Sequence, residues 1–160
     1  MSIEQVKRYL AMHGLADRVL EFSVSSATVE LAAAAVGVPP ARIAKTLSFK
    51  RGEGCMLIVL AGDTRIDNAK FKARFGMKAA MLRPEEVADR LGQAVGGVCP
   101  FAVDPSVPVY LDEAMKRFDT VFPACGSANS AIELDCESLF RLAGAAAWVD
   151  VSKPCDPQSK

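Results

Sequence analysis

The chain has 160 residues, of which 51% are hydrophobic and 24% charged, the composition of one ordinary globular domain, so an intrinsically disordered chain is excluded. Nineteen basic and nineteen acidic residues cancel, and no overall charge would draw the protein to DNA or to an anionic membrane. No apolar run approaches the roughly 20 residues of a membrane-spanning helix, and the N-terminus lacks the apolar segment of a signal peptide, so we expect a cytoplasmic location.

In the first half of the chain, apolar spacing predicts alternating helices and strands. The predicted helices cover residues 3–13, 29–36 and 67–75. The predicted strands cover residues 18–24, 43–49 and 55–61. A turn over 51–54 joins the last two strands as a hairpin. The nearly continuous apolar run 55–61 is typical of a strand that is buried on both faces.

The second half of the chain mixes the same elements with glycine-rich turns. Predicted helices cover residues 84–91, 112–118 and 137–142. Predicted strands cover residues 78–82, 107–111, 121–124, 131–134 and 145–151. The order of these elements predicts an α/β fold with a mixed, strongly curved sheet in one domain over residues 1–153. Residues 154–160 are expected to form a flexible C-terminal tail.

The cysteines and the single histidine constrain the chemistry. The cysteines stand at positions 55, 99, 125, 136 and 155. Their number is odd, no two are spaced as C-x-x-C, and His13 is the only histidine, which argues against a disulfide scaffold and a zinc site. No P-loop and no dinucleotide motif is present, so we expect neither a metal nor another cofactor. His13 lies near the end of the first predicted helix, where a structural role is expected.

Charge is distributed unevenly along the chain. The segment 42–78 contains nine basic and three acidic residues, whereas the residues after position 100 include five basic and nine acidic ones. A basic segment on a neutral protein indicates a local anionic partner. A solvated helix face is the structural alternative.

Three local features could carry chemistry. Lys45 stands in an apolar strand and shares a face with Leu47 and Phe49, so its ammonium must reach water or an anion. The loop 96–100 has adjacent glycines whose backbone amides could hold a carbonyl oxygen. The polar turn 126–129 separates two apolar strands. Each feature also has a plain structural explanation: a surface lysine, a tight turn and a hairpin turn.

Taken in order, several motifs resemble a known family. They are Ser26-Ala27-Thr28, Ile43-Ala44-Lys45-Thr46-Leu47, Gly62-Asp63, Gly96-Gly97-Val98-Cys99-Pro100-Phe101 and Ala124-Cys125-Gly126. This pattern is similar to that of the YbaK/EbsC family, the free-standing relatives of the prolyl-tRNA synthetase editing domain, and it covers about residues 20–145. The resemblance implies a barrel-like curved sheet surrounded by helices, and trans-editing, the hydrolysis of an amino acid wrongly esterified to tRNA, without a metal.

The resemblance also implies roles for particular residues. It implies catalytic roles for Lys45 and Gly97: Lys45 would hold the terminal phosphate or ribose, and the Gly96–Pro100 loop would orient the ester for attack by water. Substrate-binding residues are expected at Val24, Thr28, Phe49, Gly96, Val98, Cys99, Pro100, Gly126, Ser127 and Asn129. The implied partners are the acceptor end of a mischarged tRNA and an aminoacyl-tRNA synthetase.

Two other hypotheses stay open. The chain could be a non-catalytic module that binds tRNA or a synthetase through the basic segment 42–78. It could also be a thiol hydrolase with Cys99 as nucleophile, although no histidine is expected beside that residue.

Overall fold

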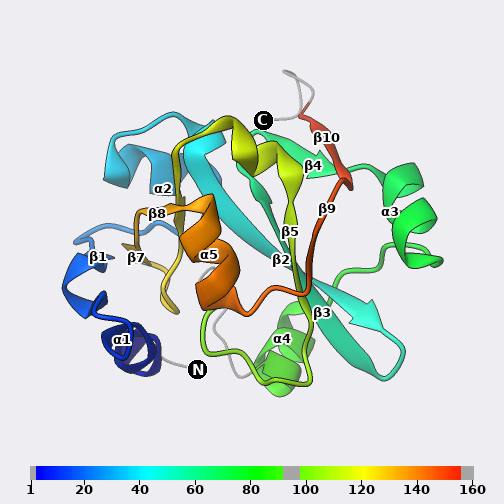
Figure 1. The fold of residues 1–160 in the computed structure, drawn as a ribbon, viewed down its shortest axis with the longest axis horizontal. Helices are drawn as coiled ribbons and strands as arrows, with labels where there is room; N and C mark the ends of the chain where they lie inside the picture. Colours follow the sequence, from blue (N-terminus) through cyan, green and yellow to red (C-terminus); the bar gives the residue numbers. More distant parts are fainter. Residues whose placement is uncertain (1–2, 92–97, 156–160) are drawn as a thin grey trace.

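The computed structural model describes residues 3–91 and 98–155 (Figure 1). Its centre is one curled, mixed β-sheet. The strands of this sheet are β2 (Ile43–Arg51), β3 (Gly54–Ala61), β5 (Val109–Asp112), β6 (Thr120–Pro123), β8 (Leu134–Asp135) and β9 (Ala147–Val149). They lie in the order β8-β6-β2-β3-β5-β9. The long antiparallel hairpin β2–β3 is flanked by the parallel pairs β2–β6 and β3–β5. The predicted α/β class with a curved mixed sheet is confirmed.

Five α-helices surround this sheet in the described ranges. They are α1 (Ile3–Ala11), α2 (Val29–Val36), α3 (Asn68–Phe75), α4 (Pro84–Leu91) and α5 (Cys136–Ala143). Short 3-10 turns occur at η1 (Ala16–Arg18), η2 (Pro40–Arg42) and η3 (Glu113–Arg117). The side chain of Thr28 accepts a hydrogen bond from the amide of Leu31 and so caps α2, which ends at Gly37 with φ 85°. Within these residues, no helix has the length and apolarity needed to cross a bilayer.

Strand β3 divides the interior into two apolar layers. Leu57, Val59 and Ala61 face a large core that includes residues of α1 and α5. Met56, Ile58 and Leu60 face a second core with Phe71 of α3. Because residues Cys55 to Ala61 are all at most 5% exposed, the prediction of a strand buried on both faces is confirmed.

Two small ribbons complete the fold. They are the antiparallel pairs β1 (Leu20–Glu21) with β7 (Ser130–Ala131), and β4 (Thr64–Ile66) with β10 (Ser152–Pro154). The second ribbon was absent from the sequence predictions, which placed the beginning of the tail at Pro154. Its strands are too short to show an alternating pattern, and their pairing joins segments that are far apart in the chain.

Three sequence predictions of local structure need correction. The predicted strand 18–24 is reduced to β1, because residues 16–18 already form a 3-10 turn. The predicted strand 78–82 is a single bridge between Phe49 and Met81. The predicted helix 112–118 is the 3-10 turn η3. In the first and third of these segments, local turn geometry prevails over the apolar pattern.

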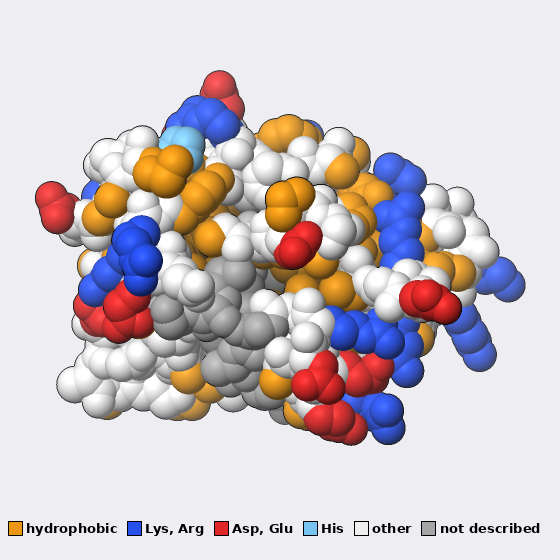
Figure 2. Space-filling view, turned by 90° about the horizontal axis from the view of Figure 1, so that it is seen from below, with side chains coloured by type: hydrophobic (Ala, Val, Ile, Leu, Met, Phe, Trp, Pro, Cys, Tyr) orange, Lys and Arg blue, Asp and Glu red, His pale blue; other side chains and the backbone are white. Residues whose placement is uncertain are grey.

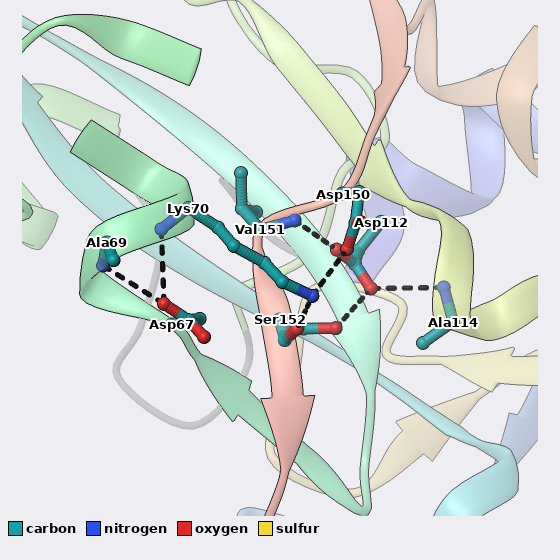
Figure 3. A network of polar contacts seen from close by, with 8 residues as sticks. All are labelled: Asp67, Ala69, Lys70, Asp112, Ala114, Asp150, Val151 and Ser152. Carbon is teal, nitrogen blue, oxygen red and sulfur yellow. Dashed lines mark hydrogen bonds and ion pairs between the residues drawn. The ribbon is translucent and has the colours of Figure 1, made fainter. Parts of the chain in front are cut away.

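A buried carboxylate fixes the ribbon β4–β10 to the central sheet (Figure 3). Asp112 is 1% exposed and accepts hydrogen bonds from the amides of Val151 (2.9 Å) and Ala114 (3.1 Å) and from the hydroxyl of Ser152 (2.6 Å). Lys70 of α3 donates to the carboxylate of Asp150 and to the carbonyl of Ser152. These contacts hold α3 and β10 against the end of β5.

Candidate active site

A cleft of about 410 Å³ opens between the segment 26–29, the edge of β2 and the start of α4. Most of its walls are apolar. The lining residues are Ser26, Ala27, Thr28, Val29, Ala32, Ile43, Ala44, Lys45, Thr46, Leu47, Ser48, Met81, Leu82, Pro84, Val87, Val98, Phe122, Ala124, Ser130 and Ala131. Among these, Lys45 is the one charged residue, so within the described structure the cleft is an apolar cavity with a single cation.

The cleft exists because one edge of β2 is only partly paired. Strand β6 pairs with Ile43 and Ala44. Further along, the carbonyl of Ser48 accepts from the amide of Leu82, and the amide of Lys50 donates to the carbonyl of Ala80. Backbone groups of alternate residues point to the same side of a strand, so those of Thr46 point to this edge as well. In the described chain no strand pairs with Thr46 on that side.

The side chain of Lys45 lies on the face of β2 that contributes Leu47 and Phe49 to the second core. The register of β2 with β3 places it on the same face as Leu47 and Phe49, as the alternation predicted. Its side chain is partly buried, and its ammonium donates a hydrogen bond to the carbonyl of Thr64. Burial lowers the pKa of Lys45 from its usual 10.5, and the nearby Cys155, Glu30 and Asp63 partly oppose this shift. The ammonium is therefore a poorly hydrated cation that an anionic ligand would stabilise.

The turn that anchors Lys45 is held tightly. A Cβ atom on Gly62 would lie 2.1 Å from the carbonyl oxygen of Pro40, so this position accepts only glycine without backbone movement. The hydroxyl of Thr64 donates to the carbonyl of Ala61. Asp63 accepts two hydrogen bonds from Arg117, at 2.6 and 3.0 Å, and this guanidinium lowers the pKa of the Asp63 carboxyl. The Gly62-Asp63 motif thus fixes the carbonyl that receives the lysine.

Of the residues expected from the sequence, Lys45, Thr28 and Val98 line the cleft together. Val24 and Phe49 are among the expected residues that do not line the cleft. Val24 is 59% exposed. Phe49 is 2% exposed and packs against the ring of Phe71 in the second core.

The expected turn residues Gly126, Ser127 and Asn129 lie behind the cleft wall. The side-chain amide of Asn129 donates to the carbonyl of Phe22, and the amide of Ser26 donates to the carbonyl of Ala128. The hydroxyl of Ser127 donates to that of Ser130. None of the three turn residues lines the cleft, but the turn as a whole positions the segment that carries Ser26 and Thr28.

The glycine-proline loop is described only in part. Gly96 and Gly97 lie outside the described residues. Cys99 and Pro100 are buried, and neither lines the cleft. Burial raises the pKa of the Cys99 thiol to about 12, so its thiolate is strongly disfavoured at neutral pH. This environment opposes the thiol-hydrolase hypothesis. In the described ranges, no group of three or more His, Cys, Asp or Glu side chains is arranged to hold a metal ion.

Sequence reasoning missed two hydroxyls that line the cleft. Ser26 Oγ and Thr46 Oγ1 are buried and have no hydrogen-bond partner in the described structure. Ser26 as a whole is 9% exposed. Both residues belong to motifs that carry the family resemblance, but a serine or threonine in a loop or strand gives no sequence signal that its hydroxyl is unpaired.

The basic segment contributes to a charged surface at one end of the molecule. Lys and Arg side chains gather at the end of the molecule that α3 occupies in Figure 1 (Figure 2). Within the described chain, Arg65, Lys72 and Lys78 make no ion pair. Arg65 stands directly opposite Lys153 in the β4–β10 ribbon. Two like charges in such a pair are unfavourable, and an anion between them would relieve the repulsion.

Comparison with known proteins identifies the class to which this fold and cleft belong. The family model for the aminoacyl-tRNA editing domain matches residues 24–142, well over half of the chain. The protein therefore belongs to the aminoacyl-tRNA editing domain family. The matched range includes the lysine strand, the glycine-proline loop and the late glycine turn.

Individual relatives agree with this assignment. The protein YwhH of Bacillus subtilis (strain 168), which is uncharacterized, is 51% identical over 155 residues, which cover 96% of this chain and 98% of the relative. A proline–tRNA ligase of Thermotoga sp. (strain RQ2) is 36% identical over 78 residues, which cover 48% of this chain and 14% of the ligase. A crystal structure assigned a provisional role as a trans-editing enzyme for prolyl-tRNA synthetase superposes with a TM-score of 0.78, at 30% identity, covering 92% of this chain and 97% of that one.

Proposed function

We propose that this protein is a trans-editing hydrolase that deacylates mischarged aminoacyl-tRNA by cleaving the ester at the 3′-terminal ribose. The observation that carries the proposal is the cleft itself. It is an apolar cavity of about 410 Å³ with one poorly hydrated cation, Lys45, and it lies in the family's matched range. A small acyl group and a nearby phosphate together would suit such a cavity.

In this proposal Lys45 binds the anionic end of the substrate. A phosphate or ribose oxygen would replace the carbonyl of Thr64 as its partner or share the ammonium with it. A lysine acts here as a compact point charge with three donors. Because the amine is partly buried, the attraction is screened less by water than at an exposed site.

The proposed hydrolysis needs no strong general base, because an aminoacyl ester is already activated. Water attacks the ester carbonyl, the bond between the acyl carbon and the ribose oxygen breaks, and that oxygen takes up a proton from the attacking water to become the ribose hydroxyl. The proposed role of the Gly96–Pro100 loop, with Gly97 at its centre, is to orient the ester through backbone amides. This role rests on the family resemblance, and Val98, which lines the cleft, is the part of the loop whose position supports it.

The proposed partners are the acceptor end of a mischarged tRNA and, through it, an aminoacyl-tRNA synthetase. The Lys and Arg side chains that gather at one end of the molecule (Figure 2), and the facing pair Arg65 and Lys153, support contact with the tRNA backbone, because phosphate contacts dominate the affinity of nucleic-acid complexes. Since aminoacyl-tRNA is used in protein synthesis, the proposed location is the cytoplasm.

A panel of mischarged tRNAs tests the function. The wild-type protein in excess is mixed with each tRNA, charged with a labelled amino acid, and the surviving ester is followed in single turnovers. We expect one or a few combinations to be hydrolysed much faster than in buffer, and correctly charged tRNA to be spared. Tight binding without accelerated hydrolysis across the panel would favour the non-catalytic tRNA-binding module instead.

A further inference from the structure

The cleft contains two buried polar atoms whose missing hydrogen bonds cost free energy in the free protein. Ser26 Oγ and Thr46 Oγ1 are both buried and unpartnered in the described structure. A buried hydroxyl without a hydrogen bond has lost its water without compensation. Native structures contain few such groups, and each one therefore requires an explanation.

Of the other three hydroxyl residues that line the cleft, Thr28 and Ser130 are already hydrogen-bonded, and the hydroxyl of Ser48 is not among the fully buried unpartnered atoms of the described structure. Thr28 accepts from the amide of Leu31 at the start of α2, and Ser130 is bonded to Ser127. Within the described lining no acidic residue is present. A ligand group that donates hydrogen bonds would therefore find two fully buried, unpaired hydroxyl oxygens in the cleft, those of Ser26 and Thr46.

The hydroxyl of Thr46 and the cation of Lys45 lie on different faces of β2. Successive side chains of a strand point to opposite faces, so Thr46 and Lys45 face opposite sides of β2 although both line the cleft. Lys45 is moreover held toward the carbonyl of Thr64. The cleft therefore offers a cation on one face of the strand and the hydroxyl of Thr46 on the other, with the hydroxyl of Ser26 elsewhere on its lining.

We propose that the hydroxyls of Ser26 and Thr46 bind the α-amino group of the aminoacyl ester, an inference that rests on the proposed function. An aminoacyl-nucleotide carries a phosphate at one end and an amino group at the other. The first matches Lys45, and the second, a donor of up to three hydrogen bonds, matches two hydroxyl oxygens. These residues then distinguish an aminoacyl group from a simple acyl group of the same size.

The test compares two ligands that differ only in the amino group. They are adenosine analogues in which a 3′-amide replaces the ester, one carrying alanyl and the other propionyl, so neither is hydrolysed. Isothermal titration calorimetry should show that the wild-type protein binds the alanyl analogue about tenfold or more tightly than the propionyl one, the range for a hydrogen bond to a charged group. In Ser26→Ala and Thr46→Val this preference should shrink, while affinity for the propionyl analogue stays unchanged.

Two further variants separate binding from folding. Thr46→Ser keeps the hydroxyl and should keep the preference. In the free protein, Thr46→Val should leave the midpoint of urea unfolding unchanged or raise it, whereas Thr64→Val, which removes a partnered buried hydroxyl, should lower it. Circular dichroism confirms that each variant is folded.

The two possible failures differ. If the wild-type protein binds both analogues and folded variants keep the full alanyl preference, the assignment of Ser26 and Thr46 is wrong and the proposed function stands. If the wild-type protein binds neither analogue and deacylates no tRNA of the panel, the proposed function fails, and this assignment fails with it.

Discussion

Two regions of the molecule bury polar groups in opposite ways. At the end of β5, the carboxylate of Asp112 is 1% exposed, and three donors satisfy its two oxygens (Figure 3). In the cleft, the hydroxyls of Ser26 and Thr46 are equally hidden and unsatisfied. A fully paired buried group fixes a structure, whereas an unpaired one lowers stability until a ligand arrives. The contrast separates residues that maintain the fold from residues available for binding.

The largest expected effect comes from removing the buried carboxylate of Asp112, whose hydrogen bonds are all satisfied. Asp112→Ala leaves the amide of Val151 and the hydroxyl of Ser152 buried without their acceptor, and should lower the free energy of unfolding by about 3–4 kcal/mol. Urea unfolding followed by circular dichroism measures this loss. Asp135→Ala is the matched control, because Asp135 also caps a helical turn but is exposed, and its loss should cost about 1 kcal/mol. Equal effects of the two variants would show that the buried network adds nothing beyond capping.

Lys45→Ala should produce the next largest effect, and it should act on function alone. The variant loses a charge-assisted contact to the substrate, so the single-turnover deacylation constant should fall by about tenfold to a hundredfold. Its stability should be unchanged or higher, because a partly buried ammonium is removed. A folded variant with wild-type deacylation would remove Lys45 from the mechanism.

The lowered pKa of Lys45 gives a second test, because binding and stability should depend on pH in opposite ways. Burial lowers this pKa below 10.5, so the charged form needed for binding should disappear at a lower pH than in an exposed lysine. The affinity for the propionyl analogue, which has no amino group to titrate, prepared with a 5′-phosphate for Lys45 to bind, should therefore fall as the pH rises through this lowered pKa. Stability should change in the opposite direction: above the folded-state pKa the unfolded chain binds more protons, so the penalty of the buried charge is relieved as the pH rises. Lys45→Arg should move the loss of affinity to higher pH, and an unmoved profile would assign the titration to another group.

The smallest expected effect concerns the exposed ion pair between Arg117 and Asp63, in the turn that anchors Lys45. Arg117→Ala removes both hydrogen bonds to Asp63, and exposed ion pairs contribute about 0.2–1 kcal/mol, so the unfolding midpoint should shift only slightly. Because Arg117 lowers the pKa of Asp63, this contribution is present above the unfolded pKa and is lost as the pH falls through the folded one. Titrating stability from pH 7 into the acid range in both proteins checks this. A large loss of stability at pH 7 would mean that this ion pair stabilises more of the protein than its own turn.

Sequence patterns predicted those parts of the fold that local chemistry determines. The helix at 29–36 begins at a threonine cap and ends at a glycine, and the hairpin follows two strongly apolar strands. The ribbon β4–β10 was missed, because two three-residue strands pair across more than half of the chain. The bridge at Met81 was predicted as a full strand, because an apolar run alone does not reveal how many residues find a partner.

The sequence indicated the cleft residue whose type is unusual for its element, Lys45, and missed the cleft residues whose types are common there, Ser26 and Thr46. Lys45 was singled out because a cation in an apolar strand costs free energy unless it reaches water or an anion. Phe49 was expected in the pocket from the family resemblance, but the cleft follows the open edge of β2 at Thr46, while Phe49 lies where the second core covers its face of the strand. Which stretch of a strand edge stays open depends on β6 and on residues 80–82, and no local pattern encodes that.

The unequal pairing along β2 also has a kinetic consequence. Strand β2 pairs with β3 over eight consecutive residues of a local hairpin, but with the distant β6 over only two. Local contacts close cheaply and early in folding, whereas distant ones bear the cost of a long loop. The hairpin is therefore expected to form before the cleft, and hydrogen exchange should protect the β3 amides most and release residues 22–28 first. The cleft would then be the last part of the molecule to assemble and the first to open.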